Sequence, residues 1–293
     1  MNIAIFGLGL IGGSLAKAIK LRTDHTVYGY DVQESVMRRA RLVEAMDEEL
    51  TPERLAYCEV ELVALYPEAI VECLRERAAS FRKGAVVIDC GGIKREICQV
   101  GRQLAAEHGW HFVGGHPMAG IEKSGFAAAR QNLFARATMI LAPSPDDMDL
   151  PMLAGVKRLF LELGFGRIRM TTAEEHDRII AYTSQLPHIV SSAFVKSRTA
   201  LSHTGFSAGS FKDLTRVATL VPSMWSQLFL DNRQPLLEEL DGLMARLAEY
   251  REAIAQGDRP RLESLLAEGR DCKAAVDELE AVALAQLERE KNQ

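Results

Sequence analysis

A glycine-rich loop between an apolar strand and a helix constrains the fold of this chain more than any other feature. The loop consists of Gly7, Leu8, Gly9, Leu10, Ile11 and Gly12, in the order G-x-G-x-x-G. Asn2–Phe6 has the pattern of a buried strand, and Gly13–Ala16 opens a helix whose N-terminus attracts negative charge. Gly7 permits a tight turn, Gly9 lets the backbone approach a pyrophosphate, and Gly12 lets the helix pack on the strand. This context predicts a dinucleotide-binding loop rather than a glycine turn that serves packing alone.

An acidic residue follows the second predicted strand, Thr26–Tyr30. Asp31 lies about twenty residues after Gly12, where an acidic side chain binds the ribose 2′-hydroxyl in such sites. Its charge would repel a 2′-phosphate, and no arginine follows before Arg38 to reverse the preference. The sequence therefore predicts NAD as the cofactor, bound by Asp31 and the glycine-rich loop.

Short apolar runs alternate with helical patterns up to about residue 170 and then stop. The alternation predicts an α/β fold, with a Rossmann-type doubly wound parallel sheet in an NAD-binding domain over residues 1–170. From Thr171 onward the pattern is helical, which predicts an all-α substrate and dimerisation domain over residues 171–293. The predicted strands are Asn2–Phe6, Thr26–Tyr30, Val60–Leu65, Ala85–Asp89, Trp110–Val113, Thr138–Ala142 and Gly166–Met170.

The composition bears on partners and location. The chain has 35 Lys and Arg against 40 Asp and Glu, a formal net charge of −5, so no global cationic field recruits nucleic acid or an anionic membrane. Its five cysteines are odd in number and include no C-x-x-C pair, which favours reduced thiols in the cytoplasm over disulfides or a zinc site. We therefore expect no metal. We also expect no signal peptide and no membrane span, because glycines interrupt the apolar N-terminal run.

The segment after the predicted strand Trp110–Val113 carries a histidine within a glycine-rich stretch. Gly114 and Gly115 precede His116, and further glycines follow it. We expect a turn at the strand end that holds the imidazole on a rigid scaffold, where it can take a proton near neutral pH. The alternative is a turn whose histidine only satisfies local hydrogen bonds.

A predicted helix early in the second domain carries a narrow polar stripe. Asp177, Ser184 and His188 recur at spacings that place them close to one helical face. Pro187 should bend the helix, so that Ser184 and His188 face one cavity. A histidine on such a helix can instead be a buried core or interface group, and His176 is a weaker candidate than His188.

Two cations lie four residues apart near the start of a further predicted helix. Lys212 and Arg216 share one helical face near a positive helix N-terminus, so they repel each other unless they face an anion. A guanidinium binds a carboxylate through two parallel hydrogen bonds, which suits Arg216 to that role. The alternative is a solvated basic face.

Long helices with apolar stripes are predicted between Gln234 and Glu288. They exceed what covering one Rossmann domain needs and predict a homodimer, with an intrachain helical bundle as the alternative. The recurring apolar residues are Leu236, Leu240, Leu243, Leu247, Leu262, Leu265 and Leu266.

Together these segments resemble the prephenate/arogenate dehydrogenase family of tyrosine biosynthesis. The segments that carry the resemblance are Gly7–Gly12 with Asp31, Gly114–Gly125, Glu174–Arg178, Ser184–His188 and Phe211–Ala218. The resemblance implies an NAD(P)-binding domain, a helical domain that dimerises, and oxidative decarboxylation of prephenate to 4-hydroxyphenylpyruvate. Arogenate is the alternative substrate.

The same resemblance implies roles for the candidate residues. His116 would be the catalytic base, and Ser184 and His188 would be active-site groups. Arg216 would bind a substrate carboxylate, and Lys212 and Glu122 complete the predicted substrate-binding residues.

The chain departs from this family at Gly92. Many members have a serine two residues before the lysine that corresponds to Lys94, so the hydroxyl partner of the histidine is missing here, and water or Ser124 could replace it. A β-hydroxyacid dehydrogenase is the alternative enzyme, but it expects a lysine with an asparagine four residues on, whereas Lys196 is followed by Ala200. A catalytically silent NAD-binding protein would leave the histidines and the basic pair unexplained.

Overall fold

The computed structural model describes residues 1–121, 123–144 and 149–291. Within these ranges an eight-stranded sheet has the order β3-β2-β1-β4-β5-β6-β7-β8. The order reverses between β1 and β4, and ligands of such sheets bind at the carboxyl ends of the strands beside this point. The strands are β1 (Asn2–Phe6), β2 (Thr26–Tyr30), β3 (Glu48–Glu49), β4 (Val60–Val63), β5 (Val86–Asp89), β6 (His111–Met118), β7 (Thr138–Pro143) and β8 (Arg167–Met170).

The predicted α/β fold is confirmed, but the sheet is not wholly parallel. Strands β1 to β6 all run parallel to one another, whereas β7 runs antiparallel to β6, and β8 runs parallel to β7. A parallel neighbour needs a long crossover, usually a helix. In the described part of the β6–β7 connection, the helical element is the short 3₁₀ turn Phe126–Ala128, so β7 returns beside β6 in the opposite direction.

Helices cover both faces of the sheet and bury two apolar clusters. Along β1, Ile3 and Ile5 contribute to one cluster and Ala4 and Phe6 to the other, as the two-residue period of a strand requires. Residues of α1, α2 and α6 pack in the first cluster, and residues of α4 and α5 pack in the second. The helices of this part are α1 (Leu10–Arg22), α2 (Glu34–Leu42), α3 (Pro52–Leu55), α4 (Pro67–Arg77), α5 (Arg95–His108) and α6 (Leu150–Glu162).

The position of His116 differs from the expected turn. His116 lies inside β6 and is paired with Ile140 of β7. The adjacent glycines serve close packing: a Cβ at Gly115 would lie 2.3 Å from the Asp89 backbone oxygen, and one at Gly114 would lie 2.5 Å from the Cys98 sulfur. The prediction of a glycine-rich turn at this point was therefore wrong, because glycine here allows β6 to approach β5 and α5.

A nearly continuous helix follows β8. It comprises α7 (Ala173–Ile180), the π-helical turn Ala181–Gln185 and α8 (Leu186–Val195), with Pro187 in the first turn of α8. A proline lacks the amide that would continue the regular hydrogen bonds, and the wider π turn accommodates the loss. The helix is followed by the 3₁₀ turn Arg198–Ser202, α9 (Gly209–Thr215), the 3₁₀ turn Arg216–Ala218 and α10 (Pro222–Asp231).

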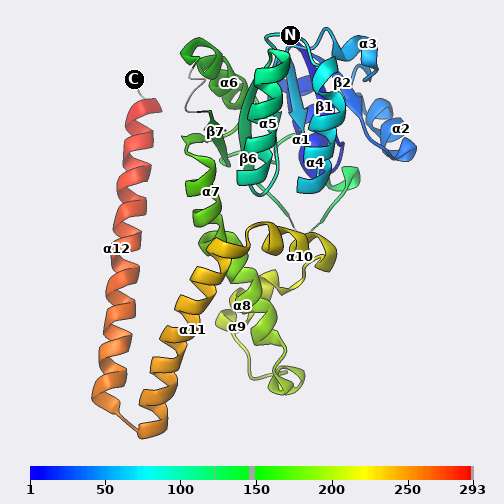
Figure 1. Ribbon diagram of the computed structural model, residues 1–293. Coiled ribbons are helices and arrows are strands. Elements are labelled where there is room, and N and C mark those ends of the chain that lie inside the picture. The colour runs from blue at the N-terminus through cyan, green and yellow to red at the C-terminus, as the bar shows by residue number, and fades with distance from the viewer. Residues whose placement is uncertain (122, 145–148, 292–293) are drawn as a thin grey trace. The chain divides into compact units, whose positions relative to one another are not determined.

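The chain divides into two compact units, Met1–Leu236 and Leu237–Gln293. The second unit contains most of α11 (Arg233–Gln256) and all of α12 (Arg259–Lys291), which form a helical hairpin (Figure 1). Tyr250 donates a hydrogen bond to the Leu265 backbone oxygen at 3.0 Å across this hairpin. The predicted domain boundary between residues 170 and 171 stays a prediction. No described helix is both long and apolar enough to cross a membrane.

Candidate active site

The glycine-rich loop lies between β1 and α1 at the point where the strand order reverses. Gly7 has a φ of 84°, and a Cβ at Gly12 would lie 1.8 Å from the Gly7 oxygen, so neither position admits a side chain. A Cβ at Gly9 meets nothing within 4 Å, so the space beside it is open. The N-cap of α1, Gly9, has no side chain to cap the helix, and the first turn of α1 contains no acid, which favours binding of an anion by the N–H groups of Leu10 and Ile11. These features fit the pyrophosphate of a dinucleotide.

Asp31 lies directly after β2 and contacts this loop. One carboxylate oxygen accepts a hydrogen bond from the Leu8 backbone nitrogen, and the other accepts from that of Gln33, both at 2.9 Å. The acidic group is thus held at the edge of the loop, where a ribose of the bound dinucleotide would lie.

His116 belongs to a cluster of three side chains. Its Nδ1 lies 2.8 Å from Nε2 of His176, and Nδ1 of His176 lies 2.7 Å from an oxygen of Asp177. His176 and Asp177, both from α7, are 2% and 1% exposed, whereas His116 is only partly buried. The cluster therefore joins β6 to α7, and His116, its outermost residue, is the one that keeps partial exposure to solvent.

Asp177 is anchored to the start of α5. Its two oxygens accept from the backbone nitrogens of Lys94 at 2.7 Å and Arg95 at 2.9 Å. Burial raises the pKa of Asp177, but the hydrogen bonds from His176 and these two nitrogens outweigh it, so the pKa lies below its ordinary value. Asn232 fixes the same turn, because its side-chain nitrogen donates to the Asp177 backbone oxygen at 2.8 Å. Asp177 is therefore a carboxylate at neutral pH.

A buried ion pair lies under the cluster. Lys94 pairs with Asp89 at the end of β5, and neither side chain is exposed. Asp89 also accepts from the Gly115 nitrogen at 3.0 Å, directly before His116. Burial, and then the charges of His176 and Lys94, lower the pKa of His116 well below its ordinary value. The imidazole is thus neutral near pH 7 and can accept a proton.

Gly92 supplies no side chain to this cluster. A Cβ there would lie 3.4 Å from a Leu228 methyl carbon, so a small side chain would fit. The Nδ1 atom of His116 instead contacts His176, which was ranked below His188 from the sequence. The available signal was the adjacent His176-Asp177 pair at the start of a helix, but its target on β6 could not be read from the sequence.

Ser184 and His188 come together on the proline-interrupted helix. Nδ1 of His188 lies 2.7 Å from the Ser184 backbone oxygen, in or next to the π turn. Because a carbonyl only accepts, Nδ1 of His188 carries a proton. The His188 ring stacks on Trp225 with centroids 3.7 Å apart. Their catalytic roles stay predictions.

The predicted substrate-binding cations lie beside α8. Lys212 belongs to α9 and Arg216 begins the following 3₁₀ turn, and both elements contact α8. Both side chains are exposed. Glu122 lies outside the described residues.

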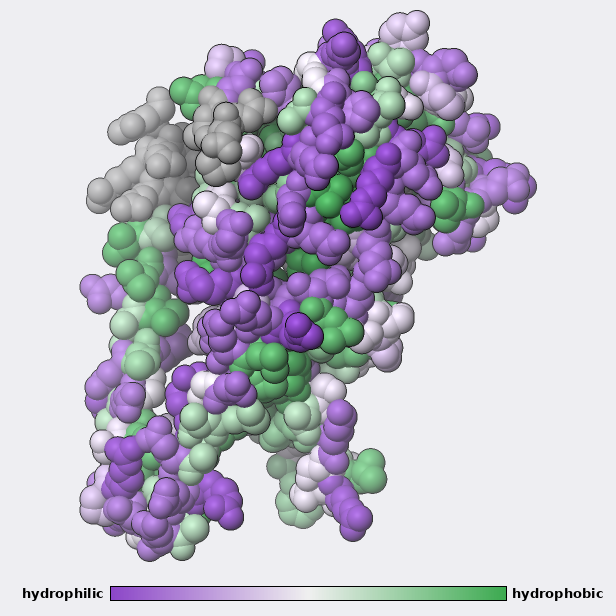
Figure 2. Space-filling model, in the orientation of Figure 1, coloured by the Kyte–Doolittle hydropathy of each residue, from purple (hydrophilic) through white to green (hydrophobic). Residues whose placement is uncertain are grey.

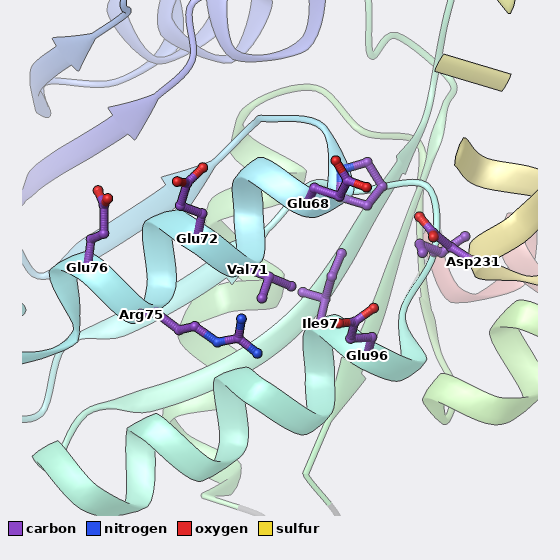
Figure 3. Close-up of a pocket in the computed structure, with 10 residues that line it drawn as sticks. Glu68, Val71, Glu72, Arg75, Glu76, Glu96, Ile97 and Asp231 are labelled. Carbon is purple, nitrogen blue, oxygen red and sulfur yellow. The ribbon is translucent and has the colours of Figure 1, made fainter. Parts of the chain in front are cut away.

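A separate pocket lies between α4 and α5 (Figure 3). Carboxylates line it, and Arg75 is the cation among its lining residues. None of the predicted site residues lines it, and an anionic substrate would be repelled there. The acidic residues are Glu68, Glu72, Glu76, Glu96 and Asp231.

Two family models together cover most of the chain. Residues 15–169 match the nucleotide-binding domain of prephenate dehydrogenase, and residues 172–268 match its dimerization domain. The chain belongs to the prephenate dehydrogenase family. The family predicted from the sequence motifs is thereby confirmed, and so is an oxidoreductase with a nucleotide-binding Rossmann domain.

Curated members of the prephenate dehydrogenase family are similar over most of the chain. The cyclohexadienyl dehydrogenase of Zymomonas mobilis is 34% identical, over 94% of this chain and 96% of that protein. The prephenate dehydrogenase of Lactococcus lactis is 30% identical, over 94% of this chain and 77% of that protein.

Solved structures of prephenate dehydrogenase relatives share the same architecture. The A. aeolicus prephenate dehydrogenase, in complex with hydroxyphenyl propionate and NAD⁺, has a TM-score of 0.80 at 27% identity and covers 94% of this chain and 98% of its own. The Synechocystis arogenate dehydrogenase has a TM-score of 0.81 at 27% identity, over 94% of this chain and 100% of its own. A 3-hydroxyisobutyrate dehydrogenase of Mycobacterium tuberculosis, at 18% identity and a TM-score of 0.54, shares the fold alone.

Proposed function

We propose that this chain catalyses the NAD-dependent oxidative decarboxylation of prephenate to 4-hydroxyphenylpyruvate in tyrosine biosynthesis. The observation that carries the proposal is the neutral imidazole of His116, which lies 2.8 Å from His176. His116 and the glycine-rich loop both lie toward the carboxyl ends of the parallel strands. A weak base beside a dinucleotide site is what oxidation of an alcohol requires. The family membership supports the reaction class.

Prephenate carries a ring carboxylate, a pyruvyl carboxylate and a 4-hydroxyl group, and each asks for a different protein group. When bound, NAD supplies the hydride acceptor. His116 takes the hydroxyl proton at Nε2, which promotes departure of the hydride, and loss of carbon dioxide then gives an aromatic ring. The protein chiefly has to orient the substrate and hold the proton.

The carboxylates of the substrate are assigned to the basic pair. Arg216 and Lys212 are exposed cations next to α8, and we assign one substrate carboxylate to Arg216 because its guanidinium can bind both oxygens. Ser184, His188 and Glu122 are proposed to complete the site around the ring.

Arogenate is the second candidate substrate. It differs from prephenate by an ammonium in place of a keto group, and the names of two relatives, a cyclohexadienyl dehydrogenase and an arogenate dehydrogenase, favour its inclusion. Formation of NADH from NAD with prephenate or with arogenate, followed by absorbance, tests both. If neither prephenate nor arogenate yields NADH, the proposed function is refuted.

We further propose that the enzyme is a cytoplasmic homodimer. Apolar side chains stay exposed along the helical hairpin, and green patches interrupt the polar surface there (Figure 2). Such unpaired apolar stripes suit a second copy of the chain, and light scattering measures the assembly. The five cysteines are free thiols, which suits a reducing compartment. The exposed apolar residues of the hairpin are Leu237, Met244, Leu247, Ile254, Leu266, Val276, Leu279 and Val282.

A further inference from the structure

The three side chains of the histidine cluster form one directed chain of hydrogen bonds. Asp177 contacts Nδ1 of His176 at 2.7 Å, and Nε2 of His176 contacts Nδ1 of His116 at 2.8 Å. A neutral imidazole has one N–H donor and one acceptor nitrogen. The location of one proton in this chain therefore determines the location of the next.

The Asp177 carboxylate determines which nitrogen of each imidazole donates its hydrogen bond. Asp177 already accepts from two backbone nitrogens, those of Lys94 and Arg95, and as a carboxylate it can only accept. Nδ1 of His176 must then be the donor. Burial lowers the pKa of His176, so the ring is neutral and its Nε2 is an acceptor. His116 consequently donates from Nδ1 and keeps its lone pair on Nε2.

We infer that His176 and Asp177 are positioning residues that hold His116 in the tautomer whose Nε2 is the free base. The inference rests on the proposed function, in which that nitrogen takes the substrate hydroxyl proton.

Protonation of His116 changes the strength of the hydrogen bonds that join His116, His176 and Asp177. The N–H at Nδ1 then donates from a cation, which makes the bond to His176 stronger. The charged groups that act on the two rings are Asp177 from α7, Lys94 at the start of α5 and Asp89 at the end of β5, and the Arg95 side chain contacts Asp177 at 3.5 Å. Lys94 is paired with Asp89, and Asp177 with the Arg95 side chain, so each of these charges has an opposite charge beside it. No proton needs to leave His116 along the chain in this step.

Nitrogen-15 spectroscopy of the histidine rings tests the tautomer directly in the unmodified protein. We expect His116, assigned through the signals lost in His116→Gln, to show a protonated Nδ1 and an unprotonated Nε2 near neutral pH. A proton on Nε2 would overturn the inference. This measurement needs no substrate, so it stands even if the chain proves not to oxidise prephenate.

Kinetics of two His176 variants provide the second test. His176→Leu removes both hydrogen bonds, and we expect kcat to fall about tenfold to a hundredfold while KM changes less than about twofold. His176→Gln should recover part of the loss, because its amide can accept from His116 and donate to Asp177.

The control is His108→Gln, at the far end of α5, about 20 Å along the helix from Arg95. It should leave kcat unchanged. If His176→Leu keeps kcat within about twofold of the parent, or if His176→Gln is no better than His176→Leu, the positioning role is refuted although the proposed function can stand.

Discussion

The Lys94 ammonium pairs with the Asp89 carboxylate where neither side chain is exposed to solvent. Asp89 also accepts a hydrogen bond from Gly115, and the Lys94 backbone nitrogen donates to Asp177. The pair therefore connects the strand that carries the base to the helix that positions it.

Breaking this pair should destabilise the fold strongly. Lys94→Met leaves a buried carboxylate without its partner, and we expect a loss of about 3–5 kcal/mol in the free energy of unfolding. Urea denaturation measures the change. Lys20→Met, which breaks an exposed pair with Asp47, is the control and should cost less than about 1 kcal/mol. Equal effects of the two substitutions would contradict the structural role of Lys94.

Removing the base should slow the reaction without weakening cofactor binding. His116→Asn is expected to lower kcat by roughly two to four decades, because general-base catalysis is lost. The dissociation constant for NAD should stay within about twofold, since the glycine-rich loop is untouched. Steady-state kinetics and calorimetry measure the two quantities, with His108→Asn as the matched control. Near-normal turnover would remove His116 from the catalytic role.

The carboxylate at the glycine-rich loop should decide between the two nicotinamide cofactors. Asp31 would accept from a 2′-hydroxyl and repel a 2′-phosphate, so kcat/KM for NAD should exceed that for NADP. Asp31→Ser removes the charge and should narrow the ratio. Equal kcat/KM values for the two cofactors in the unmodified enzyme would be inconsistent with this role.

Arg216 should act on substrate affinity. Arg216→Ala is expected to weaken prephenate binding by on the order of 2–4 kcal/mol, seen as a higher KM, and Arg216→Lys should recover only part because an ammonium cannot bind both oxygens. NAD affinity should hardly change. Arg198→Ala, another arginine of the helical region, serves as the control. A KM within about twofold of the parent would make the basic pair a solvated surface feature.

A buried acid in the sheet should make stability depend on pH. Glu61 in β4 is 0% exposed, and in the described part of the chain neither of its oxygens has a hydrogen-bond partner. Burial, opposed by the charge of Arg82, raises the pKa of Glu61 to about 9 from its ordinary 4.5. The folded state thus keeps a proton that the unfolded state loses, so the contribution of Glu61 to stability is fully present below pH 4.5 and is lost as pH rises through about 9.

The corresponding slope is about 1.4 kcal/mol per pH unit between those two values. Glu61→Gln should remove this slope from urea denaturation curves collected across that range. Glu76→Gln, on an exposed position of α4, should leave the slope as it is. A slope that survives Glu61→Gln would mean that another group causes it.

The parts of the fold that are determined by residues close together in the sequence were predictable. The strand–loop–helix start needs only local signals, and β1 and β2 have the predicted bounds. The strand β6 extends five residues beyond the predicted end, to Met118, because its glycines were interpreted as turn formers. The direction of β7 could not be inferred from its apolar pattern, which is the same for parallel and antiparallel pairing. The two-residue strand β3 is too short to give a pattern at all.

From the sequence, candidate site residues can be named one at a time, but the contacts between them cannot be predicted. Asp89, His116 and Asp177 come from three segments that are far apart in the chain, and one sequence does not indicate which of them meet. The histidine ranked lower, His176, is the one that contacts His116.

Because His116 lies within a paired strand, its imidazole is either in the correct position or on the opposite face of the sheet. His116 is a rung of the β6–β7 ladder opposite Ile140, and a slip of one residue would turn every side chain of β6 to the opposite face. Gly115 or Pro117 would then occupy the place of the imidazole. The imidazole therefore cannot shift its position in small steps, as a base on a flexible loop can. Variation during evolution or engineering must act on the groups that surround a fixed imidazole, and single-residue insertions or deletions in β6 should abolish activity outright.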